Sequence, residues 1–188
     1  MSELEGTPVE VESATRRFVA WVWAPQRRFI PLFLGFLWLL TKAADSIPQS
    51  ALQSLLVATT WVDFHLIDLF TDKVAMHGTT LTFDGFAVRV ITECTGLYEA
   101  VILSAAILAY QASWKQRIVG ILGGTAILYA INIVRIAFLL LVGRFAPSSF
   151  DFAHVYFWQS LLIVFITAIW IGWIHYCVHN DSDTPLHA

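Results

Sequence analysis

Charged residues are scarce in this sequence. They make up 13% of the 188 residues, against 57% hydrophobic residues, whereas a soluble domain usually carries about 25% charged residues. Together with long apolar runs, this deficit excludes an ordinary soluble domain and predicts an all-α protein that crosses the membrane several times. The net charge is only −3, and we expect the lipid bilayer, and no nucleic acid, among its partners.

Cysteine is also scarce. The two cysteines, Cys94 and Cys177, lie in separate apolar segments, without a CxxC motif or the Cys/His spacing of a zinc site. We therefore expect no disulfide between them, no bound metal and no cofactor. An apolar core for a cleavable signal peptide is missing as well, because residues 1–24 contain four glutamates.

The length of the chain predicts one domain. We expect a polar N-terminal tail with a basic interfacial segment at 1–28, a membrane-embedded domain at 29–177 and a polar C-terminal tail at 178–188. The apolar runs of the membrane domain predict about four transmembrane helices, at residues 29–47, 96–112, 118–142 and 154–177.

Residues 49–70 are apolar but contain Asp63, His65 and Asp68. A charge at the centre of a bilayer costs about 2.5–3.5 kcal/mol. We therefore favour an amphipathic helix at the outer surface, or a shallow re-entrant helix, over a true span. The three polar side chains are better explained as groups at the membrane interface than as metal ligands.

Two β-prone runs, at residues 79–83 and 86–91, flank Asp84-Gly85. An Asp-Gly pair between such runs predicts a tight turn. We expect a small extracytoplasmic β-hairpin that leads the chain to Cys94.

Two basic clusters decide the predicted topology. The first contains Arg16, Arg17, Arg27 and Arg28, and the second is Trp114-Lys115-Gln116-Arg117. The positive-inside rule places both on the cytoplasmic face of the inner membrane. Cys94 and His154 then lie on the extracytoplasmic face. Residues 49–70 begin and end on this same face and do not cross the membrane.

Three reactive residues are predicted to converge at that outer face. A helix start at Cys94 and a nearby cation favour the thiolate, although burial would oppose it. His154 begins the last span and can act as a general acid and base. Arg135, about 12 Å below the outer end of its helix, can stabilise an anion that develops at a carbonyl oxygen. Cysteine, histidine and a cation suffice for acyl transfer through a thioester.

Each of these residues also has a purely structural interpretation. A lone cysteine in a membrane domain is often a small core residue, and a histidine at a helix end is often interfacial. An arginine within a span can extend its charge toward the interface. The functional hypothesis depends on three separate elements meeting on one face.

The three motifs resemble known ones. Glu93-Cys94-Thr95-Gly96-Leu97, Asn132-Ile133-Val134-Arg135-Ile136 and the segment at His154 resemble, in order and spacing, the signature blocks of the exosortase/archaeosortase family. Residues 143–159 are most similar to the short exosortase H type. Trp158 stands where many relatives have glycine, which leaves the substrate motif open.

The resemblance implies a membrane cysteine transpeptidase or protease. Such an enzyme cleaves the C-terminal sorting signals of membrane-anchored substrate proteins, made of a short motif, a membrane helix and a basic tail, and transfers the protein to an acceptor. It implies that Cys94, Arg135 and His154 are the catalytic residues. For support or substrate binding we expect Asn132, Thr95, Gly96 and Glu99.

Two other functions remain open at this point. A small transporter subunit would use Arg135 to line a polar path and would not need Cys94. A noncatalytic assembly factor in exopolysaccharide or surface-protein export would tolerate loss of both Cys94 and His154. The sequence leaves the acceptor and the oligomeric state open.

Overall fold

The computed structural model describes residues 28–179. The N-terminal half contains two helices and three strands: α2 (Phe29–Asp45), α3 (Gln49–Asp68), β1 (Val74–His77), β2 (Thr80–Phe83) and β3 (Phe86–Arg89). A 3₁₀ turn at Thr92–Cys94 leads into the two helices α4 (Leu97–Ala109) and α5 (Trp114–Phe145). The last segment combines a 3₁₀ turn (Pro147–Ser149), a π-helical stretch (Phe152–Phe157), α6 (Trp158–Trp173) and a second π-helical stretch (Ile174–His179).

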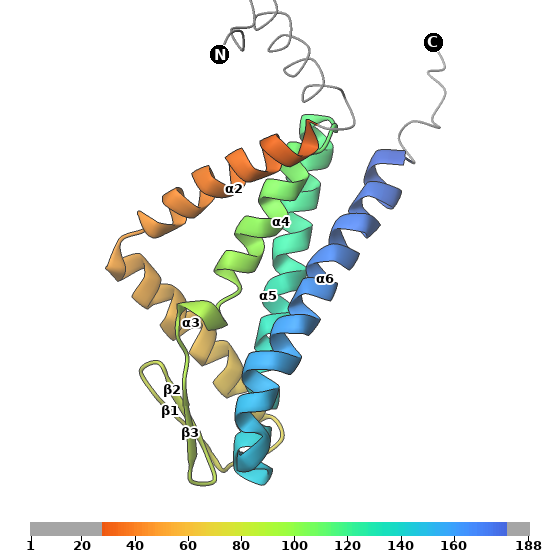
Figure 1. Ribbon diagram of the computed structural model, residues 1–188. Coiled ribbons are helices and arrows are strands. Elements are labelled where there is room, and N and C mark those ends of the chain that lie inside the picture. The colour runs from red at the N-terminus through yellow and green to blue at the C-terminus, as the bar shows by residue number, and fades with distance from the viewer. Residues whose placement is uncertain (1–27, 180–188) are drawn as a thin grey trace, which may run out of the picture.

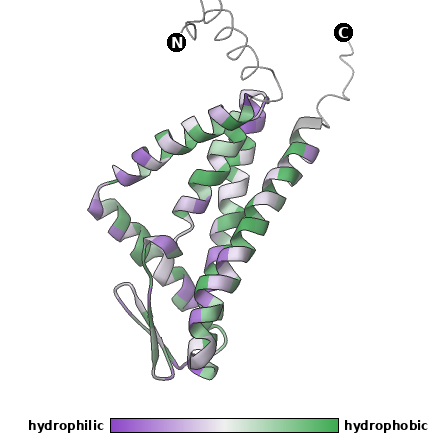
Figure 2. Ribbon diagram, viewed as in Figure 1, coloured by the Kyte–Doolittle hydropathy of each residue, from purple (hydrophilic) through white to green (hydrophobic). Residues whose placement is uncertain are grey.

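Helices α4, α5 and α6 lie side by side (Figure 1). Small residues on α5 allow this close approach. A Cβ atom added to Gly120 would overlap the Trp173 indole, and one added to Gly124 would lie 2.5 Å from a methyl group of Leu103. Hydrophobic residues predominate along α5 and α6 (Figure 2), so the three helices form an apolar bundle.

Four spans are not confirmed within residues 28–179. Two helical segments, Trp114–Phe145 and Pro147–Cys177, are long and apolar enough to cross a membrane, and the bent pair of α2 and α3 would make a third. Helix α4 has 13 residues and is about 20 Å long, shorter than a hydrocarbon core of about 30 Å. The span expected at 96–112 is therefore shorter than predicted.

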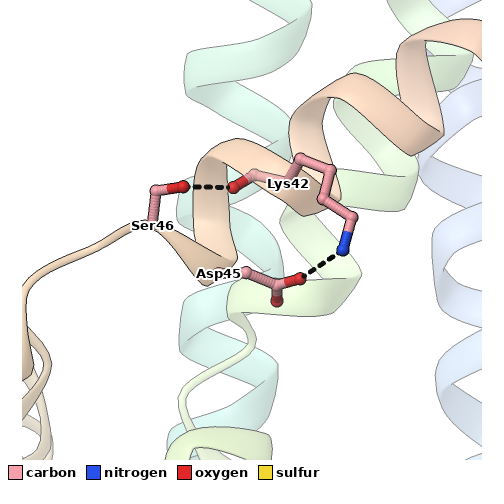
Figure 3. Close-up of polar contacts among 3 residues, drawn as sticks. All are labelled: Lys42, Asp45 and Ser46. Carbon is pink, nitrogen blue, oxygen red and sulfur yellow. Dashed lines mark hydrogen bonds and ion pairs between the residues drawn. The ribbon is translucent and has the colours of Figure 1, made fainter.

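Helices α2 and α3 meet at an angle of 92°. At the end of α2, the Ser46 hydroxyl donates to the carbonyl of Lys42 over 2.7 Å, and the Lys42 ammonium lies 3.6 Å from Asp45 (Figure 3). Pro48 then continues the chain in an extended conformation before α3. The exposed charges at this corner favour a position near the membrane interface over one at the centre of the bilayer.

One face of α3 is buried although it is polar. Thr59, Thr60 and Asp63 are all 0% exposed, and the hydroxyl of Thr59 lies 3.4 Å from that of Tyr129 on α5. The prediction of Asp63 as an interfacial group is therefore wrong, because α3 turns this residue toward the protein. His65 and Asp68 are exposed, so the three polar residues do not share one face.

The three strands form an antiparallel sheet in the order β1-β2-β3. The predicted hairpin is confirmed: β2 and β3 are joined by Asp84 and Gly85, whose φ angles of 46° and 89° suit a tight turn. The strand β1 was not predicted. It precedes a second tight turn at Gly78, which has a φ of 62°, and this glycine is the signal in the sequence that marks it.

The sheet is attached to the C-terminal end of α5. The side chain of Phe86 occupies the space where Gly143 has no Cβ atom. Arg144 donates to the carboxylate of Asp84 from Nη2 at 2.8 Å and from Nε at 2.9 Å. Beneath the sheet, α3 and α5 contribute to one apolar cluster of buried residues, which contains Ile67, Val74, Leu81, Phe83, Val90, Cys94, Ile136 and Leu140.

Candidate active site

Cys94 lies in the short connection between the sheet and α4. It ends the 3₁₀ turn, its N–H donates to the carbonyl of Ile91 over 2.8 Å, and the residue is 5% exposed. The hydroxyl of Thr95 donates to the carbonyl of Thr92 over 2.7 Å and stabilises the same turn. Cys94 therefore precedes the first residue of α4 by three positions, which weakens the predicted effect of the helix dipole on its thiol.

The turn after Cys94 is held against α5. Gly96 adopts a left-handed conformation with a φ of +75° and directly precedes α4. It lies against the side chain of Asn132, which is 0% exposed and donates from Nδ2 to the carbonyl of Leu128 over 3.1 Å. Two of the predicted supporting residues therefore contact each other.

His154 lies in the π-helical stretch before α6. Its ring stacks on Phe150, with centroids 5.8 Å apart and an interplanar angle of 3°, and Phe150 also packs against Phe86 of β3 at 5.5 Å. The Nδ1 atom of His154 is buried and has no hydrogen-bond partner in the described part of the chain. π-helical turns are often found at functional sites.

Cys94 and His154 line the same cavity. It has a volume of about 250 Å³ and extends from β3 to the start of the last helical segment, and it is lined by Phe86, Ala87, Val88, Arg89, Val90, Ile91, Cys94, Ile136, Leu139, Phe150 and His154. The hairpin was predicted to lead the chain to Cys94, but the lining of this cavity by β3 and Phe150 was not predicted. The β-prone residues at 86–91 predicted the strand, but not that it would share a cavity with His154.

Arg135 is not among the residues that line this cavity. It is 4% exposed, and its Nε atom has no hydrogen-bond partner among the described residues. Its positive charge acts on both Cys94 and His154. Arg135 is therefore close enough for its charge to act on both residues that line the cavity.

Burial dominates the ionisation of Cys94. It raises the pKa of the thiol above its ordinary value, and the negative charges of Glu93 and Glu99 act in the same direction. A hydrogen bond from the Ile91 backbone and the charge of Arg135 lower this pKa, but they do not cancel the effect of burial. The sequence left this competition open, and the packing of Cys94 into the apolar cluster decides it.

The other supporting candidates differ in their surroundings. Glu99 is half-buried, and its Oε2 atom is buried without a hydrogen-bond partner among residues 28–179. Thr95 and Gly96 line a second, larger cavity of about 510 Å³ between α3, α4 and α5. No group of three His, Cys, Asp or Glu residues within the described range is arranged to hold a metal ion.

The fold and the site define a largely helical membrane protein with a cysteine and a histidine beside a shared cavity. The family model described as transmembrane exosortase matches residues 18–174. The chain therefore belongs to the transmembrane exosortase family, and the predicted family is confirmed. No curated protein and no solved structure matches the chain. Membership of this family suggests a role in the processing of sorting signals.

Proposed function

We propose that this protein is a membrane cysteine transpeptidase that cleaves C-terminal sorting signals and transfers the processed protein to an acceptor. The observation that carries this proposal is the shared cavity of Cys94 and His154, together with the charge of Arg135 acting on both residues. Cys94 is the nucleophile, His154 the general acid and base, and Arg135 the group that stabilises negative charge.

In the acylation step, His154 accepts the thiol proton and the Cys94 sulfur attacks the carbonyl carbon of the scissile peptide bond. The carbon–nitrogen bond then breaks, and His154 returns the proton to the leaving amine. The amino-terminal part of the substrate remains on Cys94 as a thioester. A nucleophile on the acceptor attacks the thioester carbonyl and restores the thiol.

The unpartnered Nδ1 atom of His154 supports this role, since a general base needs an acceptor atom that no other group occupies. The raised pKa of Cys94 supports it as well, because a protonated resting thiol needs a base to remove its proton. A transporter subunit or a noncatalytic assembly factor requires neither feature.

Removal of the substrate's C-terminal tail, followed on a gel, tests the proposal. Cys94→Ala is expected to abolish cleavage while the protein remains folded and in the membrane. Cys94→Ser is expected to be nearly as inactive, because a hydroxyl ionises far less readily than a thiol. Arg135 and His154 remain in place in both variants, so the loss is assigned to the sulfur.

Cys177→Ala is the matched control. Cys177 lies at the other end of the bundle, where its carbonyl accepts a hydrogen bond from the side chain of Gln116, and its loss should leave cleavage unchanged. If the tail is removed at the normal rate in Cys94→Ala, the enzyme proposal is wrong. The transporter or assembly-factor function then takes its place.

A further inference from the structure

Strand β3 lies at the edge of the sheet, because the strand order is β1-β2-β3. It pairs with β2 on one side, and no strand of the described chain pairs with its other side. An open edge carries backbone N–H and C=O groups that can pair with a further strand.

The register shows which residues present these groups. Val90 donates to the carbonyl of Thr79 over 2.8 Å. Hydrogen-bonded and non-hydrogen-bonded pairs alternate in an antiparallel ladder, so Val88 and Phe86 also direct their backbone groups toward β2. Ala87 and Arg89, paired with Thr82 and Thr80 in the non-hydrogen-bonded positions, direct theirs to the open edge.

This open edge faces the cavity of Cys94 and His154. Six consecutive residues, 86–91, line the cavity, although side chains of a strand point alternately to opposite faces. A cavity on one face of the sheet would contact every second residue. A cavity that contacts all six follows the edge of the strand.

The edge leads directly to the thiol. Ile91 follows Ala87 and Arg89 at the same two-residue interval, its carbonyl accepts the N–H of Cys94, and its backbone also makes a hydrogen bond with the Cys94 sulfur. From Ala87 to Arg89, where β3 ends, the open edge extends over about 7 Å, and Ile91, whose backbone groups are hydrogen-bonded to Cys94, connects it to the thiol. An extended peptide that pairs with this edge and continues in the same direction reaches Cys94.

We propose that the substrate segment containing the scissile bond binds in an extended conformation, as an added strand on the open edge of β3. This inference rests on the proposed function and specifies how the substrate is held at the same site. Main-chain hydrogen bonds to Ala87 and Arg89 align the peptide, and alternate side chains face the wall formed by Leu139 and Phe150. The peptide carbonyl at the end of the added strand then lies beside the Cys94 sulfur.

Alkylation of Cys94 tests this inference without a natural substrate. In a Cys177→Ala background, Cys94 is the one cysteine of the chain. The probe is acetyl-trialanyl chloromethyl ketone, and chloroacetone carries a comparable reactive group without a peptide. The ratio of the two rates measures the contribution of peptide binding, because the chloroacetone rate corrects each variant for changes in thiol reactivity.

In the parent protein we expect the ratio of the peptide rate to the chloroacetone rate to be well above one. In Ala87→Pro and in Arg89→Pro this ratio should fall about three- to tenfold, because each proline removes one hydrogen-bond donor from the edge. Proline is tolerated at edge positions whose N–H makes no ladder bond. Met76→Pro is the matched control. Met76 is at the equivalent position on β1, the strand at the opposite edge of the sheet, and its backbone groups do not bond to β2. The rate ratio of Met76→Pro should therefore equal that of the parent protein.

N-methylation of the probe provides a second measurement on the unaltered edge. Methylation of an amide that faces β3 should lower the ratio, whereas methylation of the neighbouring amide should not. Equal effects at consecutive amides, or equal ratios in Ala87→Pro, Arg89→Pro and Met76→Pro, would overturn the added strand. Alkylation does not require cleavage of a sorting signal. The alkylation rates therefore test the added strand, and tail removal in Cys94→Ala tests the peptidase proposal independently.

Discussion

Gly96 and Asn132 are in direct contact between α4 and α5. A Cβ atom on Gly96 would lie 2.6 Å from Nδ2 of Asn132 and 3.3 Å from its Cγ atom. Gly96 follows Cys94 by two residues, and Asn132 precedes Arg135 by three on the same helix. This contact therefore joins the turn that follows Cys94 to the helix that carries Arg135.

Gly96→Ala should impair both folding and activity. A non-glycine residue in the left-handed region costs about 1–2 kcal/mol, and the added methyl group displaces the Asn132 side chain. We expect a lower free energy of unfolding in detergent and reduced tail removal. Gly123→Ala is the control, because a Cβ there meets nothing within 4 Å and alanine suits a helix. Equal stability of the two variants would contradict the importance of the contact.

The pH dependence of Cys94 alkylation should reflect its buried position. Thiolate is the reactive form, and burial disfavours it, so the pKa of Cys94 is raised. In Cys177→Ala protein the iodoacetamide rate should increase about tenfold per pH unit through the neutral range and level off only above the ordinary thiol pKa. Glu99→Gln removes a negative charge that raises this pKa, and should move the midpoint to lower pH. A midpoint below pH 8 in the parent protein would contradict this assignment.

Arg135→Lys should retain little processing activity. Lysine keeps the positive charge but lacks the planar guanidinium, whose geometry suits an oxygen anion. We expect at least a tenfold loss in the rate of tail removal at equal protein level, an effect of the size expected for one stabilising group at the site. Arg117→Lys is the control, since Arg117 lies near the start of α5, where it donates to the carbonyl of Tyr110 over 3.0 Å. Normal processing by Arg135→Ala would rule out this role.

Single-cysteine labelling should reveal the membrane topology. In a Cys94→Ser, Cys177→Ser background, cysteine at position 148 should react with an impermeant thiol reagent from the extracytoplasmic side, and cysteine at position 115 should not. The two positions lie at opposite ends of the bundle, because Lys115 is the second residue of α5 and Ser148 follows the end of this helix. The reverse pattern of labelling would place the sheet and Cys94 in the cytoplasm and refute the predicted orientation.

Several features were predictable because they depend on neighbouring residues alone. The scarcity of charge predicted a membrane protein, since the bilayer excludes charge over long apolar stretches. Asp84-Gly85 predicted the turn between β2 and β3, because both residues accept positive φ angles. The motifs at Cys94, Arg135 and His154 predicted the family, because family motifs are properties of the sequence.

Other features depend on segments that are distant in the sequence, and only the tertiary structure decided them. The pKa of Cys94 is raised because α3, the sheet and α5 enclose it in one apolar cluster. Asp63 is buried because the rotation of α3 against the protein turns that face inward. The open edge of β3 lies beside Cys94 and His154 because Phe86 and Asp84 attach the sheet to the end of α5. Hydropathy and turn preferences specify the elements, but burial and edge exposure arise only when those elements pack together.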